Sequence, residues 1–164
     1  MYEEQYSFAF KVYNSIDELN NEDAMLLKKA RKITHNAYAP YSHFSVGAVS
    51  RLKNGAFVKG TNQENASFPA GICAERVLLS SVSSQYPREI IEAIAVSYYN
   101  EDGDSDKPVS PCGICRQTLL EYEERQQQSI RLILGGLEGK VYVIEKAGVL
   151  MPLSFTKNDL KKVR

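Results

Sequence analysis

The chain has 164 residues, 43% of them hydrophobic, and its twenty basic and twenty acidic side chains cancel. This length provides one ordinary hydrophobic core, so we expect a single domain. A chain without net charge has no bulk positive field to attract a polyanion, which argues against a nucleic acid polymer as its main ligand. The sequence has no run of 18 apolar residues, and Glu3 and Glu4 stand where a secretory signal would be basic and then apolar. We therefore expect a soluble, cytoplasmic protein with no membrane contact.

The first predicted element is a short, half-buried strand at residues 6–12. Tyr6, Phe8, Phe10 and Val12 alternate there with smaller or polar residues, and a period of two is typical of a strand with one buried face.

A helix is predicted next. Ser15 and Glu18 have the spacing of a capping box, and Asn21 is a second possible cap. Apolar residues then recur at helical spacing over residues 22–37, and Pro40 prevents the helix from continuing.

A hairpin is predicted after this helix. Two extended segments, residues 44–52 and 56–60, are joined by Asn54 and Gly55. Asn-Gly between two extended segments is a strong signal for a tight turn, so we expect two antiparallel strands.

The second half of the chain alternates helices and strands. An acidic, polar stretch at residues 100–110 is expected to be a solvated loop, and Pro111 suits the first position of a helix because its missing N–H needs no partner there. This alternation predicts an α/β fold with a mixed central β-sheet flanked by helices. The predicted elements are a helix at residues 71–86, a strand at 90–99, a helix from Pro111 to about residue 124, and strands at 130–134 and 141–144.

The three cysteines carry the main chemical signal. Cys112 and Cys115 are three residues apart at a predicted helix start, so their thiols lie on one face near the positive end of the helix dipole. Cys73 comes from the start of a different helix. Three protein ligands with the fourth position open are typical of catalytic zinc, and Glu75, two residues after Cys73, is placed to move protons there without binding the metal.

Three other interpretations remain open. A CxxC pair can be a redox pair, although such pairs need no distant Cys-x-Glu segment. A structural zinc site needs four protein ligands, and His35 and His43 are not at a usual spacing from a cysteine. Free cysteines are also often simply buried.

Several segments resemble the successive blocks of the cytidine deaminase family. Cys-x-Glu followed by Pro-Cys-x-x-Cys matches the signature of zinc deaminases. A cysteine as first ligand resembles the small, three-cysteine, homotetrameric branch, which implies a three-layer sandwich fold. The matching segments, between residues 35 and 155, begin at Tyr41 (YSHFSVGA), Asn62 (NQENAS), Cys73 (CAER), Ser110 (SPCGICRQ) and Met151 (MPLSF).

The resemblance implies a reaction and a cofactor. The expected reaction is zinc-dependent hydrolytic deamination of cytidine and deoxycytidine to uridine and deoxyuridine plus ammonia, in pyrimidine salvage. One Zn²⁺ per subunit would be held by Cys73, Cys112 and Cys115, with Glu75 as the catalytic proton carrier.

The resemblance also assigns residues to the substrate. Asn62 and Glu64 should bind the ribose hydroxyls, Phe44 should lie against the pyrimidine ring, and the backbone around Ala74 and Ser110 should hold the pyrimidine edge.

Three thiolates and one Zn²⁺ carry a net negative charge, which makes the metal a poorer acid. Arg76 lies three residues after Cys73 and is expected to donate to the ligand sulfurs, with Gln117 assisting. The family also implies a homotetramer in which Phe155 contributes to a neighbour's site.

Three features depart from the family. The segment at residues 68–71 replaces a frequent Tyr-Gly, and the loop at 100–106 is long. We treat residues 1–21 as an N-terminal extension, either an added edge strand or a subunit contact, and residues 22–164 as one deaminase domain. The alternatives are a deaminase of another cytosine-like ligand, an editing deaminase acting on RNA or DNA, and a zinc-stabilised binding module without turnover.

Overall fold

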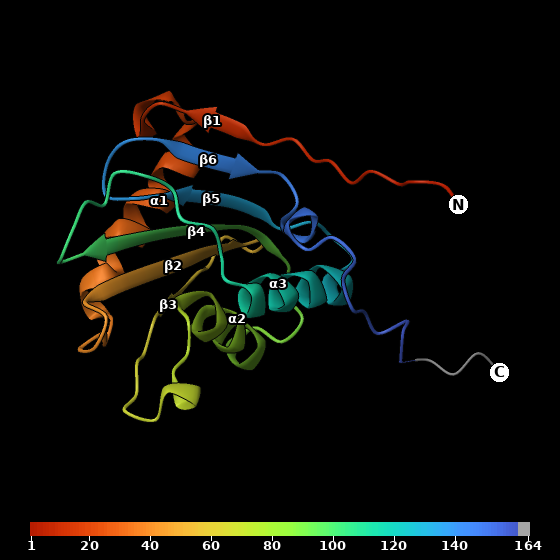
Figure 1. The fold of residues 1–164 in the computed structure, drawn as a ribbon. Helices are drawn as coiled ribbons and strands as arrows, with labels where there is room; N and C mark the ends of the chain where they lie inside the picture. Colours follow the sequence, from red (N-terminus) through yellow and green to blue (C-terminus); the bar gives the residue numbers. More distant parts are fainter. Residues whose placement is uncertain (161–164) are drawn as a thin grey trace.

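The computed structural model describes residues 1–160 and contains one six-stranded sheet (Figure 1). The strand order across the sheet is β1-β6-β5-β4-β2-β3. The β4 and β5 strands are parallel and the other neighbours are antiparallel, so the sheet is mixed as predicted. The strands are β1 Lys11–Tyr13, β2 Phe44–Leu52, β3 Phe57–Thr61, β4 Ile91–Asn100, β5 Arg131–Gly135 and β6 Val141–Ile144.

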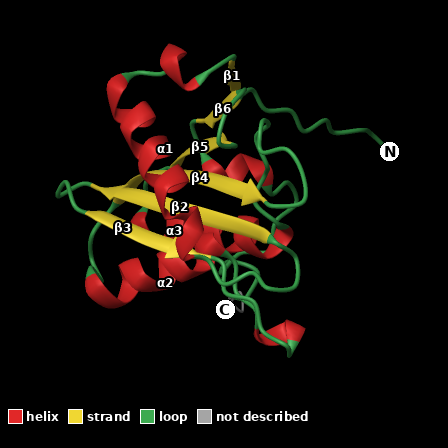
Figure 2. Cartoon of the chain, turned by 90° about the vertical axis from the view of Figure 1, so that its left-hand side faces the viewer, coloured by secondary structure: helices red, strands yellow, loops and turns green. Residues whose placement is uncertain are grey.

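The predicted hairpin is confirmed. Gly55 has a φ of 85°, a left-handed conformation that a side chain disfavours, and the turn it forms joins β2 to β3. In the side view of Figure 2, β4, β2 and β3 run next to one another and α2 (Ala74–Gln85) lies along β3.

Helices cover both faces of the sheet, giving three layers. Helix α1 (Asn21–Ile33) packs on one face against β2, β4 and β5. Helices α2 and α3 (Gly113–Gln126) lie on the other face. The two faces bury separate clusters of side chains, one around Leu27 and Ile133 under α1 and one around Leu78 and Leu119 under α2 and α3. The expected three-layer α/β architecture is confirmed.

Among residues 1–160, no helix is both long and apolar enough to cross a membrane.

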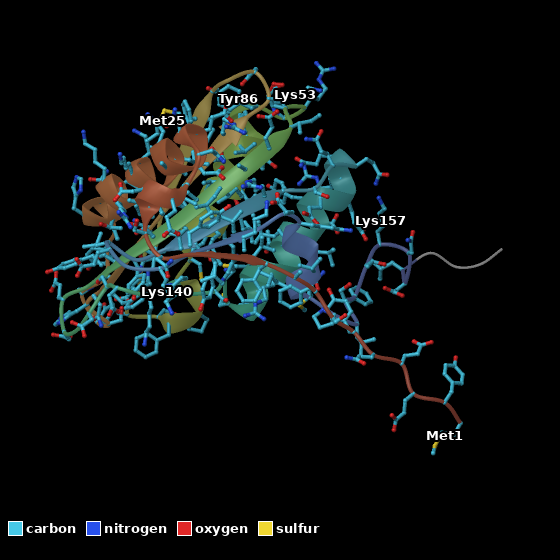
Figure 3. All side chains as sticks on the ribbon, turned by 90° about the horizontal axis from the view of Figure 1, so that it is seen from above. Met1, Met25, Lys53, Tyr86, Lys140 and Lys157 are labelled. Atoms are coloured by element: carbon cyan, nitrogen blue, oxygen red, sulfur yellow. The ribbon has the colours of Figure 1, made fainter. Side chains whose placement is uncertain are left out.

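The predicted N-terminal strand is wrong over most of its length. Only Lys11–Tyr13 pair with β6, and residues 1–10 belong to no strand. The partner strand β6 is four residues long and therefore offers too few backbone groups to pair a longer β1. The N-terminal arm, residues 1–10, still contacts the body of the molecule, because the ring of Phe10 packs on Tyr142 and the Tyr6 hydroxyl donates to the carbonyl of Val149. Its first residue, Met1, lies well away from the sheet (Figures 1 and 3).

The first helix begins differently from the prediction. Ser15 and Glu18 form only a short 3-10 turn, in which Ser15 accepts from the N–H of Asp17. The cap of α1 is Asn20 rather than Asn21, because its side chain accepts from the N–H of Asp23 at 2.9 Å.

The two helices that carry cysteines also begin later than predicted. Cys73 is the N-cap of α2 and Cys112 is the N-cap of α3, so Pro111 precedes its helix and is not the first helical residue. Both cysteines therefore lie at the point where a helix begins. The strands predicted at 44–52 and 141–144 have the predicted bounds, and the strands at 56–60, 90–99 and 130–134 are each shifted by one residue. The helix predicted over 22–37 is wrong at its end, because α1 stops at Ile33 and a 3-10 turn follows.

Gly60 on β3 lets the first turn of α2 approach the sheet closely. A Cβ at this position would lie 2.4 Å from both the carbonyl oxygen of Ala74 and the nitrogen of Leu78. Because these are backbone atoms of a packed helix, they cannot move aside cheaply.

We predict that Gly60→Ala lowers the free energy of unfolding by about 1–3 kcal/mol, since α2 must shift away from β3. Urea unfolding measures this loss. Gly113→Ala is the matched control, because no atom lies within 4 Å of its added Cβ. Equal stability of Gly60→Ala and the wild type would show that α2 can move freely.

Candidate active site

The starts of α2 and α3 bring the three cysteines together. The sulfurs of Cys73 and Cys112 are 3.7 Å apart, those of Cys112 and Cys115 are 3.5 Å apart, and all three lie within 4.8 Å of one another. None is in a disulfide. Residues separated by 39 positions in the chain therefore form one cluster, as their spacing predicted.

This cluster fits zinc. Tetrahedral zinc with Zn–S bonds of about 2.3 Å places its sulfur ligands about 3.8 Å apart, close to the observed separations. Cys115 is fully buried, Cys73 is half-buried and Cys112 is exposed, so the cluster is open on one side. Three thiols with one open side match a catalytic rather than a closed structural site.

The thiols differ in acidity. A hydrogen bond from Cys115 and a second one from Cys112 lower the pKa of Cys73 to about 6, and the charge of Arg76 acts in the same direction. The pKa of Cys115 is raised, chiefly because it shares its proton with Cys73 and because it is buried. One thiolate is thus available near neutral pH to start metal binding.

Glu75 lies beside the cluster in the first turn of α2. Its side chain is only 6% exposed, and this burial raises the pKa of its carboxyl group. A buried carboxyl group with a raised pKa next to an open metal position is suited to accept and return protons.

A cavity of about 230 Å³ opens onto Glu75 and two of the cysteines. Four of the five residues that the sequence analysis assigned to the substrate line this cavity. Glu64 and Cys115 do not line it. The lining residues are Phe44, Val46, Asn62, Cys73, Ala74, Glu75, Val96, Val109, Ser110 and Cys112.

Strand register explains why these residues meet. Phe44 begins β2 and pairs with Asn100 at the end of β4, while Asn62 directly follows β3, which runs antiparallel to β2. The beginning of β2 and the ends of β3 and β4 therefore share one end of the sheet. The loop that carries Ser110 crosses the same end before α3 begins.

Phe44 is supported by a residue that sequence reasoning missed. The ring of Tyr98 stacks on that of Phe44, with centroids 4.7 Å apart and planes 13° apart. Val46 and Val96 were also missed, although their alternation with Phe44 and Tyr98 along β2 and β4 is a period-2 signal for one shared face. The β2–β4 register that brings the two strands together is not visible in the sequence.

Asn62 and Glu64 both make contacts within the chain. The amide of Asn62 accepts from the N–H of Val46 at 2.7 Å and donates to the carbonyl of Phe44 at 2.9 Å. Glu64 accepts from the Ser42 hydroxyl and from the N–H of Tyr41 at 2.9 Å. The Ser42 hydrogen bond is the main reason why the pKa of the Glu64 carboxyl group is lowered, so Glu64 is an acceptor at neutral pH.

Neither of the two residues expected at the sulfurs hydrogen-bonds to one among residues 1–160. Among the described residues, no hydrogen bond joins Arg76 to a cysteine sulfur, and Arg76 acts on Cys73 through its charge. Gln117 donates instead to the carbonyl of Phe155 at 2.8 Å, which ties the C-terminal segment to α3. The side chain of Phe155 itself is 58% exposed.

A wider hollow of about 840 Å³ adjoins the cavity across Phe44 and Val109. Its walls come from Tyr98, the loop at residues 100–110 and the turn before β6. It contains neither a cysteine nor Glu75, so the reactive groups belong to the smaller cavity.

We predict that Cys115→Ser weakens zinc binding by more than the roughly 10–100-fold typical of losing one outer hydrogen bond. Serine is a poorer zinc ligand than a thiolate because its hydroxyl stays protonated. Metal analysis after dialysis against a weak chelator measures this. Ile114→Ser, an exposed neighbour on the same turn, is the control and should retain zinc. Full zinc content in Cys115→Ser would contradict a three-cysteine site.

Comparison with known proteins agrees with this site. The model of the cytidine and deoxycytidylate deaminase zinc-binding region matches residues 20–128. A cytidine deaminase from Halalkalibacterium halodurans is 38% identical over 136 residues, covering 83% of this chain and 96% of its own. One from Sporosarcina psychrophila is 35% identical over 135 residues, covering 82% of this chain and 92% of its own. The crystal structure of cytidine deaminase from Burkholderia pseudomallei has a TM-score of 0.70 and 34% identity, covering 84% of this chain and all of that one. The chain belongs to the cytidine and deoxycytidylate deaminase family of zinc-binding proteins.

Proposed function

We propose that this protein is a cytidine deaminase that hydrolyses cytidine and deoxycytidine to uridine and deoxyuridine with release of ammonia, a reaction of pyrimidine salvage. The observation that carries the proposal is the meeting of Glu75 and the cysteine cluster at one cavity of about 230 Å³. Neither a redox pair nor a structural zinc site has a use for a buried carboxyl group beside an open metal position.

Each reactive group has a separate role. Cys73, Cys112 and Cys115 would hold zinc, which when bound supplies a Lewis acid that lowers the pKa of water to near neutrality. Glu75 takes a proton from the attacking water and delivers protons to N3 and to the leaving amine of the pyrimidine. Water adds its oxygen to C4, and the C4–N bond breaks to give ammonia.

Contacts away from C4 select a nucleoside. The ring of Phe44, fixed by Tyr98, offers a flat face for the pyrimidine. The backbone at Ala74 and Ser110 holds the pyrimidine edge. Asn62 and Glu64 bind the ribose hydroxyls, and Glu64 reaches the sugar from the rim since it lies outside the cavity lining. A site of this kind rejects a ligand that leaves its polar groups unpaired, so free cytosine should be a poor substrate.

Arg76 and Gln117 are proposed to tune the thiolates. The charge of Arg76 already lowers the pKa of Cys73, which offsets part of the excess negative charge of three thiolates. Gln117 acts indirectly in this proposal, because it holds the C-terminal segment against α3.

We further propose a homotetramer in the cytoplasm. Tyr41 and Phe68 pack edge to face near the site, with ring centroids 6.0 Å apart, and both are mostly exposed. Phe155 is also exposed, and these aromatic side chains are suited to a subunit contact. Unpaired cysteines at the metal centre favour a reducing compartment.

The loss of cytidine absorbance on incubation with purified protein tests the reaction. We predict that Glu75→Gln retains about one zinc per chain but loses turnover by roughly 10²–10⁴-fold, because the amide cannot carry protons. Glu101→Gln, at an exposed position outside the cavity, is the matched control and should remain fully active. Wild-type turnover in Glu75→Gln would exclude Glu75 as the proton carrier.

We predict that light scattering of the purified protein gives four times the 18.4 kDa chain mass. Phe155→Ala should lower kcat/KM for cytidine about 2- to 12-fold, because an aromatic contact contributes about 0.5–1.5 kcal/mol. Leu160→Ala, another exposed apolar side chain near the C-terminus, serves as the control. A fully active monomer would rule out a site completed by a neighbour.

A further inference from the structure

The hydroxyl group of Ser42 lies between two residues that are proposed to touch the substrate. It donates to Oε1 of Glu64, and it accepts from the backbone N–H of Phe44 at 3.2 Å. These directions are fixed, because an ionised carboxylate can only accept and a backbone N–H can only donate. One hydroxyl therefore joins the carboxylate proposed for the sugar to the residue proposed for the base.

The backbone of Ser42 strengthens the same connection. Its N–H donates to Oε2 of Glu64 at 3.3 Å, next to the bond from the N–H of Tyr41. Both carboxylate oxygens are thus oriented by residues 41–42. Glu64 belongs to no helix or strand, and these contacts orient its carboxylate.

Two further contacts hold Phe44. Its carbonyl accepts from the amide of Asn62 at 2.9 Å, and its ring stacks on Tyr98. The Ser42 hydroxyl is the partner of its remaining backbone group, the N–H. Removing that hydroxyl would free one end of Phe44 and one oxygen of Glu64 at the same time.

The turn that contains Ser42 needs such support. The next residue, His43, has a φ of 54°, a left-handed conformation that is unfavourable for a residue with a side chain. Its N–H donates to the carbonyl of Ala39, and its ring pairs with Asp102 at 3.1 Å. Several hydrogen bonds therefore hold this exposed turn in one conformation, and Ser42 makes three of them.

We propose that Ser42 is a positioning residue that couples recognition of the sugar by Glu64 to recognition of the base by Phe44. The inference rests on the proposed function, since it assumes that these two residues contact a nucleoside. Ser42 itself lies outside the cavity lining and acts through its two partners.

Two substrates separate this role from a general effect on folding. Cytidine offers the ribose hydroxyls to Glu64, whereas 2′,3′-dideoxycytidine does not. Ser42→Ala should lower kcat/KM for cytidine about tenfold, the effect typical of losing a hydrogen bond to a charged group. The loss for dideoxycytidine should be clearly smaller, because only the Phe44 contact is then affected. Ser42→Thr keeps a hydroxyl and should restore most of the activity.

A double variant tests the coupling directly. If Ser42 acts through Glu64, then Ser42→Ala combined with Glu64→Gln should cost little more for cytidine than Glu64→Gln alone. Ser45→Ala is the matched control, because Ser45 is in the same segment and its side chain has no hydrogen bond among residues 1–160. Zinc content and thermal unfolding are measured for every variant. Should Ser42→Ala not fold, Ser42→Cys, with a weak donor of similar shape, is expected to show the same pattern.

The outcomes are distinct. Equal losses on the two substrates, additive losses in the double variant, or wild-type activity of Ser42→Ala would each overturn the coupling role while the proposed function stands. A zinc-loaded wild type that leaves cytidine unchanged would overturn the proposed function, and the Ser42 inference with it.

Discussion

The close approach of α2 to β3 at Gly60 is the constraint on which the site depends. It allows the first turn of α2 to lie close against the sheet, and that turn carries Cys73 as N-cap and Glu75 as the second helical residue. Glu75 is buried in this turn, and the burial raises the pKa of its carboxyl group. The turn that Gly60 lets approach the sheet therefore carries both a cysteine of the cluster and a buried carboxyl group that holds its proton more tightly than an exposed one.

Helix α3 must also be fixed in position, because its start brings Cys112 and Cys115 to Cys73 at the start of α2. The buried carboxylate of Glu123, near the end of α3, accepts from the backbone N–H groups of Ile130, Ala147 and Gly148 at 2.7–2.9 Å. These bonds hold α3 to the start of β5 and to the 3-10 helix after β6. With α3 fixed near its C-terminal end and Cys112 and Cys115 at its start, the positive ends of two helix dipoles converge on the thiol cluster. A positive field at this point is suited to the negative charge that metal-bound thiolates would carry.

The substrate side of the site has a different origin. It is built from strand ends and exposed loops, where side-chain hydrogen bonds rather than core packing hold the groups in place. Asn62 accepts a hydrogen bond from Val46 in β2, and the Ser42 hydroxyl joins Glu64 to Phe44. The ring of Tyr98 stacks on that of Phe44. The cysteine cluster is thus held by core packing, whereas the proposed substrate contacts are held by side-chain hydrogen bonds.

Most secondary-structure elements and the cysteine site were predictable from the sequence, because they depend on local patterns. Helical spacing, the Asn54-Gly55 turn and the Cys-x-Glu and Cys-x-x-Cys motifs each act within a few residues, and the structure confirms the hairpin and the clustering of the thiols.

The predicted length of β1 and the predicted cap of α1 were wrong, because pairing with the short β6 and the choice between adjacent caps depend on contacts the pattern does not contain. Tyr98 and Ser42 could not be placed from the sequence either. Their roles depend on the β2–β4 register and on a loop returning 22 residues later, and such long-range contacts exist only once the chain has folded.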